Sequence, residues 1–172
     1  MKKDKILLYM ITNRVFIYSL NKKKEIVEEV NTSTFFSSSI IKDVKECSRC
    51  LQKIVKKYNL INGIIKADIN VLYNNITLCD IKELYRLALE PLDFNKITYT
   101  PIEALLNTLS EPEKIVYYDG DEYTSFYKKK KSSDIKDFSN DIVVVGNIDS
   151  EHMHYSSRDL IWEMYKRSFT KD

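Results

Sequence analysis

The chain has 172 residues, of which 44% are hydrophobic, and this is enough for one domain with a sizeable core. Its 27 basic and 25 acidic residues leave a formal charge of +2, too little for the broad basic surface that nucleic-acid backbones require, so no nucleic-acid partner is expected. No run approaches the roughly 18 apolar residues of a membrane span, and an odd number of cysteines fits a reducing compartment. We therefore expect a cytoplasmic protein.

The N-terminal part of the chain predicts an antiparallel meander. Residues Lys5–Ile11 and Val15–Leu20 are rich in strand-forming side chains, and Thr12-Asn13-Arg14 separates them. Asn13 is the residue best able to adopt a positive φ in so short a turn. Glu25–Val30 is the third predicted strand.

From Ser39 onward the hydrophobic period becomes helical. The apolar residues recur at steps of three and four and share one stripe: Ile40, Val44, Cys47, Leu51, Ile54, Val55 and Tyr58. Ile64–Tyr73 returns to strand chemistry, and Thr77 is the predicted N-cap of a second helix that runs to about Leu89. The inward residues of this second helix are predicted to be Ile81, Leu84, Tyr85 and Ala88.

A short strand, Lys96–Tyr99, and a helix that starts at Pro101 complete an element order of βββαβαβα. Beyond Glu111–Glu113, a second hairpin is predicted from Lys114–Tyr118 and Tyr123–Lys128. The remaining predicted elements are a lysine- and serine-rich mobile loop over Lys128–Asn140, a buried strand over Asp141–Gly146 and a final helix bearing Leu160, Ile161, Met164 and Tyr165. We therefore expect one α/β domain over residues 1–172, with a first half at 1–110 and a truncated second half or extension at 111–172.

This element order resembles the ribonuclease H-like fold, and actin-like ATPases contain two such halves in tandem. Short motifs add to the resemblance: the Thr77 helix start, Pro101-Ile102-Glu103-Ala104, the hairpin Ile115–Gly120 with Thr124, and Val143–Asn147. The resemblance implies a ribonuclease H-like or actin-like half followed by a truncated second half. It also implies a role beside the bacterial actin-like proteins of cell shape, division or pilus assembly.

The residues at the predicted nucleotide site depart from the family pattern. Actin-like phosphate hairpins need an acidic residue and adjacent glycines, because only glycine lets successive backbone amides turn toward phosphate. Tyr9–Arg14 contains neither Asp nor Gly, and the second turn has only Gly120. Ile6–Ile11 also lacks the carboxylate that a two-metal nuclease of this fold requires. We expect a degenerate member of the superfamily that is not an enzyme and binds no cofactor.

Other candidate sites have simpler explanations. Cys47-Ser48-Arg49-Cys50 has the spacing of a zinc half-site, but only Cys79, His152 and His154 could complete it, so we predict one core and one near-surface cysteine. His152 and His154 could share a face of a strand, without a third ligand nearby in the sequence. Asp119, Asp121 and Glu122 form an acidic turn that lacks a calcium-loop pattern.

Two features are candidates for interaction. The lysines Lys128, Lys129, Lys130 and Lys131 form the one long charge run, which suits a solvated loop or an acidic partner. Trp162 falls off the apolar stripe of the last helix, so it is expected to face outward unless a partner, such as a second copy in a homodimer, buries it.

The sequence therefore favours a non-catalytic interaction protein, an adaptor or assembly factor in a bacterial multi-protein complex that includes membrane-associated machinery. One alternative is a nucleotide-binding protein with an altered site between the Asn13 and Gly120 turns. A weaker alternative is a nucleic-acid-binding module that uses the lysine run.

Overall fold

The computed structural model describes residues 3–37, 39–61, 65–74, 80–108, 114–118, 123–127, 130–132, 142–146 and 160–170. Its contacts divide the chain into two compact units, Met1–Tyr73 with Thr77–Thr100, and Asn74–Ile76 with Pro101–Asp172. The boundary at Thr100 places the helix after Pro101 in the second unit, whereas the sequence predicted it as the last element of the first half.

The first unit is built on a five-stranded sheet with the order β3-β2-β1-β6-β7. Its strands are β1 (Lys5–Ile11), β2 (Arg14–Ser19), β3 (Lys24–Glu29), β6 (Asp68–Tyr73) and β7 (Lys96–Pro101). β1, β2 and β3 form the predicted antiparallel meander, and β6 pairs in parallel with β1. The predicted meander is confirmed, and the parallel pairing of β1 with β6 is a finding of the structure.

Helix α1 (Val44–Lys57) begins later than the apolar period predicted. Asp43 is its N-cap, and the Asp43 carboxylate accepts a hydrogen bond from the backbone N–H of Glu46 at 3.1 Å. The preceding residues Ile40–Ile41 form β5, which pairs with β4 (Phe36–Ser37). The predicted helical position of Ile40 is therefore wrong, because the side chain of Asp43 fixes the helix start downstream of it.

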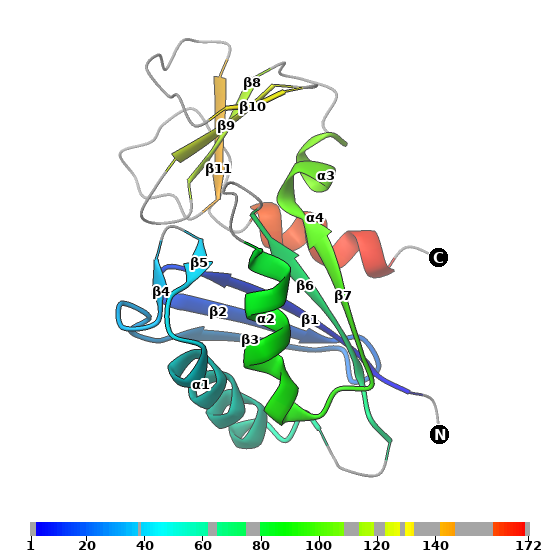
Figure 1. The fold of residues 1–172 in the computed structure, drawn as a ribbon. Coiled ribbons are helices and arrows are strands. Elements are labelled where there is room, and N and C mark those ends of the chain that lie inside the picture. The colour runs from blue at the N-terminus through cyan, green and yellow to red at the C-terminus, as the bar shows by residue number, and fades with distance from the viewer. Residues whose placement is uncertain are drawn as a thin grey trace. The chain divides into compact units, whose positions relative to one another are not determined.

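Helix α2 (Ile81–Leu89) continues into a 3₁₀ turn, η1 (Glu90–Leu92). Its N-cap is Asp80, which accepts from the backbone N–H of Glu83 at 3.2 Å. The prediction of Thr77 as the cap is therefore wrong, because Asp80 takes that role; Thr77 itself lies outside the described residues. Figure 1 shows α1 and α2 on the same face of the five-stranded sheet.

The core of the first unit lies between this sheet and the two helices. Cys47 and Leu51 of α1, with Tyr85 and Ala88 of α2, are buried against the inward side chains of β1 and β6. Leu84 is only partly buried, whereas Leu89, the last residue of α2, is fully buried. The predicted stripes face the core, but Ile40, Val44, Val55 and Tyr58 of the first stripe and Leu84 of the second are only partly buried.

The opposite face of the sheet is also buried. Leu7, Tyr9 and Ile11 of β1 are almost fully buried, and the rings of Tyr9 and Phe16 stack with their centroids 5.4 Å apart. A strand buried on both faces needs apolar residues at successive positions rather than at alternate ones. This explains the uninterrupted apolar run of β1.

The second unit contains a four-stranded sheet with the order β10-β9-β8-β11. Its elements are α3 (Ile102–Leu106), β8 (Lys114–Tyr118), β9 (Tyr123–Tyr127), β10 (Lys130–Ser132), β11 (Ile142–Gly146) and α4 (Leu160–Thr170). β8, β9 and β10 are antiparallel neighbours, and β11 is parallel to β8. This arrangement repeats the order β3-β2-β1-β6 of the first unit, so the two halves begin alike, as predicted.

The predicted loop over Lys128–Asn140 is wrong at Lys130–Ser132, which form strand β10. Lys130 pairs with Tyr127 and Lys131 with Phe126, so both lysines lie in strand β10. The backbone groups on the outer side of β9 find hydrogen-bonding partners in this way, and lysine is a common residue in a strand at the edge of a sheet. Lys128 and Lys129 lie outside the described residues.

Candidate functional site

The turn between β1 and β2 occupies the position where the family resemblance predicted a phosphate hairpin. Thr12 and Asn13 form the turn, and Asn13 has a φ of 63°, the left-handed conformation that the sequence predicted for it. Asparagine tolerates this conformation better than most residues with a Cβ atom. The turn therefore closes the hairpin without glycine.

A reciprocal pair of hydrogen bonds locks this turn to the segment after β3. The backbone N–H of Asn13 donates to Thr32 Oγ1 at 2.9 Å, and the backbone N–H of Thr32 donates to Asn13 Oδ1 at 3.2 Å. The carbonyl of Asn13 accepts from the backbone N–H of Val30 at 3.2 Å. We call these three contacts the Asn13–Thr32 lock. The backbone N–H of Asn13, which a phosphate-binding turn would direct toward the anion, is therefore already hydrogen-bonded to Thr32.

The residue that follows the turn is engaged as well. Arg14 forms an ion pair with Glu29 across β2 and β3, and its guanidinium carbon lies 5.8 Å from the centroid of the Phe16 ring. The Arg14 side chain is only 13% exposed, so its guanidinium group stabilises the pairing of β2 with β3 and is not presented to a ligand in solution. At the first hairpin, the backbone N–H, the carbonyl and the side-chain oxygen of Asn13 are thus all bonded within the chain.

Of the residues that the sequence offered as candidate metal ligands, the structure describes only Cys47 and Cys50. Gly120 with the acidic turn, and Cys79 with both histidines, lie outside the described residues. Cys47 is buried and Cys50 half-buried, both as free thiols, and burial raises the pKa of Cys47 to about 12. The prediction of one core and one near-surface cysteine is confirmed. In the described ranges, no group of three metal-ligating side chains occurs.

Trp162 does not face outward. It is 1% exposed, with its ring centroid 5.9 Å from that of Tyr165, and Lys166 Nζ lies 5.4 Å from the Trp162 ring centroid. The buried residues of α4 are Ile161, Trp162 and Tyr165, so the apolar stripe is rotated relative to the predicted one. A large aromatic ring gains more by burial than a partly buried methionine such as Met164, which explains the rotation.

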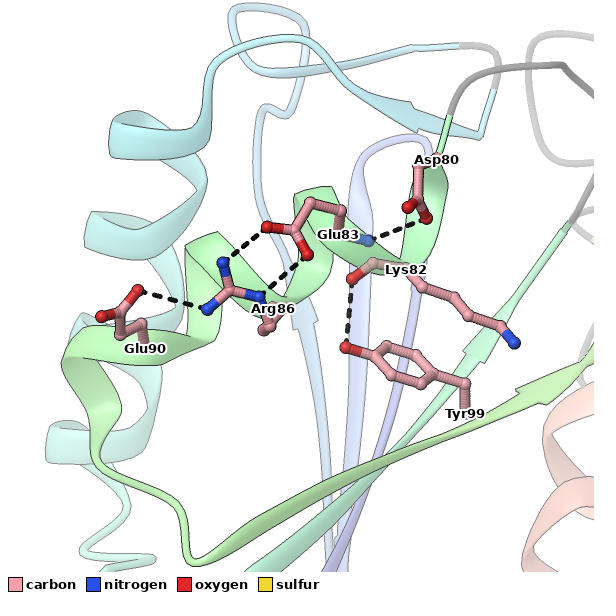
Figure 2. A network of polar contacts seen from close by, with 6 residues as sticks. All are labelled: Asp80, Lys82, Glu83, Arg86, Glu90 and Tyr99. Carbon is pink, nitrogen blue, oxygen red and sulfur yellow. Dashed lines mark hydrogen bonds and ion pairs between the residues drawn. The ribbon is translucent and has the colours of Figure 1, made fainter.

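A polar cluster on α2 has a structural role (Figure 2). Arg86 donates to Glu83 through Nε at 2.9 Å and Nη2 at 2.5 Å, and its Nη1 lies 3.7 Å from Glu90 Oε2. Tyr99 of β7 donates its hydroxyl hydrogen to the carbonyl of Lys82 at 3.0 Å, which ties α2 to the sheet. The side chains of Glu83, Arg86 and Glu90 are 47%, 48% and 67% exposed, so these ion pairs lie on the surface of the helix and contribute little to stability.

A groove that the sequence did not predict lies between β3, the segment after it and α1. It has a volume of about 390 Å³ and an apolar floor of Val30, Phe35 and Ile54. We call it the β3–α1 groove. The only feature of the sequence that could indicate this groove is the polar run Asn31-Thr32-Ser33-Thr34. Such a run is equally typical of an ordinary surface loop, so it does not predict a binding site.

Glu28 is the main acidic group at this groove. Its Oε1 accepts from Lys57 Nζ at 2.8 Å and from the Tyr58 hydroxyl at 2.6 Å. The hydrogen bond from Lys57 is the first cause, and that from Tyr58 the second, of a pKa for Glu28 below its usual range. This cluster joins β3 to the C-terminal end of α1.

We expect the Glu28→Gln variant to be less stable than the wild type at neutral pH and equally stable near pH 2. A folded-state pKa below the unfolded one, about 4.3, stabilises the native state above that value, and the effect disappears as pH falls through the folded pKa. Urea unfolding at several pH values measures this difference. A gap between the two proteins that does not change with pH would rule out an ionic role for Glu28.

Among the residues that the structure describes, no helix is long and apolar enough to cross a membrane. No protein-family model matches the chain, and no curated protein sequence matches it.

Solved structures do match. The ethanolamine utilization protein EutJ from Carboxydothermus hydrogenoformans matches with a TM-score of 0.53 and 10% identity, over 77% of this chain and 50% of EutJ. MreB5 of Spiroplasma citri bound to AMPPNP matches with a TM-score of 0.51 and 12% identity, over 79% of this chain and 51% of MreB5. The chain thus spans about half the length of these structures. The predicted fold is confirmed: the chain has the fold of the actin-like and ribonuclease H-like superfamily.

Proposed function

We propose that this chain is a non-catalytic interaction protein, an adaptor or assembly factor in a bacterial multi-protein complex, built on an actin-like scaffold. The observation that carries the proposal is the Asn13–Thr32 lock. A turn that binds phosphate must present backbone N–H groups to the anion. Here the Asn13 N–H and side chain are both bonded to Thr32, so the surfaces rather than the turn would carry the function.

The flanking residues support the same proposal. A phosphate cradle benefits from a nearby cation, yet Arg14 is bonded to Glu29 and covers Phe16. Neither Tyr9 nor Ile11, which lie near the turn on the face of β1 opposite the helices, can hold a magnesium ion through oxygen in the way a carboxylate does. The partners that fit such a scaffold are other proteins, including those of a membrane-associated machine.

Calorimetric titration of the full chain with magnesium and ATP, and with AMPPNP, tests this proposal. AMPPNP is a suitable probe because the similar MreB5 structure contains it. We expect no saturable binding of either nucleotide in the micromolar range. A dissociation constant in or below that range would contradict the proposal and favour a nucleotide-binding protein with an altered site.

A companion variant establishes whether the lock forms in solution. Thr32→Val preserves the shape of the side chain but removes the acceptor for the Asn13 N–H, so it should lower the free energy of unfolding by about 1 kcal/mol. The exposed residue Thr34 supplies the control variant, Thr34→Val. Equal stability of the two variants would remove the observation on which the proposal rests.

A further inference from the structure

Strand β3 is the last strand on its side of the five-stranded sheet. The backbone N–H of Val30 donates to the carbonyl of Asn13, and hydrogen-bonded positions alternate along an antiparallel strand. Ile26 and Glu28 therefore direct their backbone groups toward β2, while Val27 directs its N–H and C=O away from the sheet. In the described part of the chain, no strand pairs with this outer side.

Both faces of the sheet offer side-chain contacts beside this edge. Val27 is 44% exposed, the highest exposure of a large hydrophobic residue in the described part of the chain. On the other face, the β3–α1 groove lies where the inward side chains of an added strand would project, next to Glu28 and Val30. An added strand would thus cover Val27 with one set of side chains and fill the groove with the other.

The charges of the groove define the complementary chemistry. Three cations of α1 line it, and two of them are already paired: Arg49 with Glu46, and Lys57 with Glu28. Within the described residues, Lys53 has no carboxylate partner. The groove therefore combines an apolar floor with one cation, Lys53, to which no carboxylate of the described residues is bonded.

We propose that β3 is a docking edge for an extended segment of a partner protein, which adds to the sheet as a further strand. This segment presents a small apolar side chain to Val27 on one face, and an apolar and an acidic side chain to the groove floor and Lys53 on the other. Main-chain hydrogen bonds at an edge supply affinity in this mode of recognition, and the alternate pockets supply specificity. The inference rests on the proposed function, because it names the surface that an interaction protein would use.

A second copy of this chain is a poorer occupant. Antiparallel pairing of β3 with its own copy about Val27 would place Glu25 opposite Glu29 of the other copy, and this would occur at both ends of the pair. Like charges directly opposite each other destabilise a strand pair. The acidic residues of β3 therefore disfavour self-association through this edge.

A labelled synthetic peptide tests the docking edge. The probe is a capped strand of about six residues with valine and threonine on one face, and leucine and aspartate on the other. Fluorescence anisotropy with the full chain should show saturable binding. N-methylation of the amides that face β3 should weaken it by about tenfold or more, whereas N-methylation of the alternate amides should leave it within about twofold. No binding at about 1 mM peptide, or equal losses in both methylated series, would overturn the proposal.

Variants of the protein give a second, independent readout. Val27→Pro removes the outward N–H without removing a bond to β2, which is where an edge strand tolerates proline, and it should abolish peptide binding. Lys53→Glu should weaken binding of the aspartate-containing peptide. It should strengthen binding of a second peptide in which lysine replaces that aspartate. Lys56→Glu, on α1 but outside the lining of the groove, should change neither. Identical behaviour of the Lys53 and Lys56 variants would overturn the role of the groove.

These titrations contain no nucleotide, so the two proposals fail separately. Tight ATP binding would contradict the proposed non-catalytic function and leave the peptide results intact. Absence of peptide binding would remove the docking edge while the Asn13–Thr32 lock and its consequence for nucleotides remained.

Discussion

Replacing Leu51 with alanine should lower the free energy of unfolding by about 2–5 kcal/mol. Leu51 is 1% exposed and lies in the layer between α1 and the five-stranded sheet. The truncated side chain would leave a cavity that the packed neighbours on the sheet and on α2 cannot fill without moving. Urea unfolding monitored by circular dichroism measures the change.

Two leucines of α2 provide matched controls for this substitution. Leu84→Ala should cost less than Leu51→Ala, because Leu84 is only partly buried, and Leu87→Ala should cost least, because Leu87 is 37% exposed. The expected order of loss is therefore Leu51, Leu84, Leu87. A loss at Leu87 as large as that at Leu51 would show that the orientation of α2 is wrong.

Replacing Trp162 with alanine should destabilise the second unit by about 3–5 kcal/mol. Trp162 is 1% exposed and packs beside Tyr165, so its removal leaves one of the largest voids that a single substitution in α4 can make. Because the chain has only this one tryptophan, its fluorescence reports the site directly. We expect a blue-shifted emission that is protected from a soluble quencher.

The same measurements distinguish a buried Trp162 from one at a subunit boundary. Sedimentation at the same protein concentrations measures whether the chain is a monomer. Trp162 should be protected from the quencher even in the monomer, since its burial arises within one chain. Phe169→Ala, a substitution at a partly exposed ring 5.6 Å from Tyr165, should have a smaller effect on stability. A red-shifted emission that is open to the quencher in the monomer would instead support the outward orientation of Trp162 that the sequence predicted. It would also support the prediction that a second copy covers this residue in a homodimer.

Local features of the fold could be predicted from the sequence because short segments determine them. The β1–β2 hairpin follows from two strand-forming runs and the positive φ of Asn13. The start of α1 could not be read from apolar spacing, because Ile40 continues the helical period although it belongs to β5. The informative residue there is Asp43, whose effect is a single hydrogen bond to a backbone amide.

The candidate sites were harder to predict because they depend on residues distant in sequence. The sequence showed that the first hairpin lacks glycine, but not that Thr32, nineteen residues after Asn13, satisfies the turn. The β3–α1 groove likewise combines residues of a strand, a loop and a helix. The orientation of Trp162 was mispredicted because the apolar stripe of α4 can be drawn at more than one angle around the helix.

The two kinds of pairing made by β1 have a consequence for the order in which the chain assembles. Its antiparallel partner β2 follows after a short turn, whereas its parallel partner β6 pairs Lys5 with Asp68. Closing a short loop costs less chain entropy than closing a long one, so the meander can form as soon as β2 and β3 leave the ribosome. Until β6 arrives, the apolar β1 has one open side during synthesis, and this is the interval in which a chaperone would have most to protect.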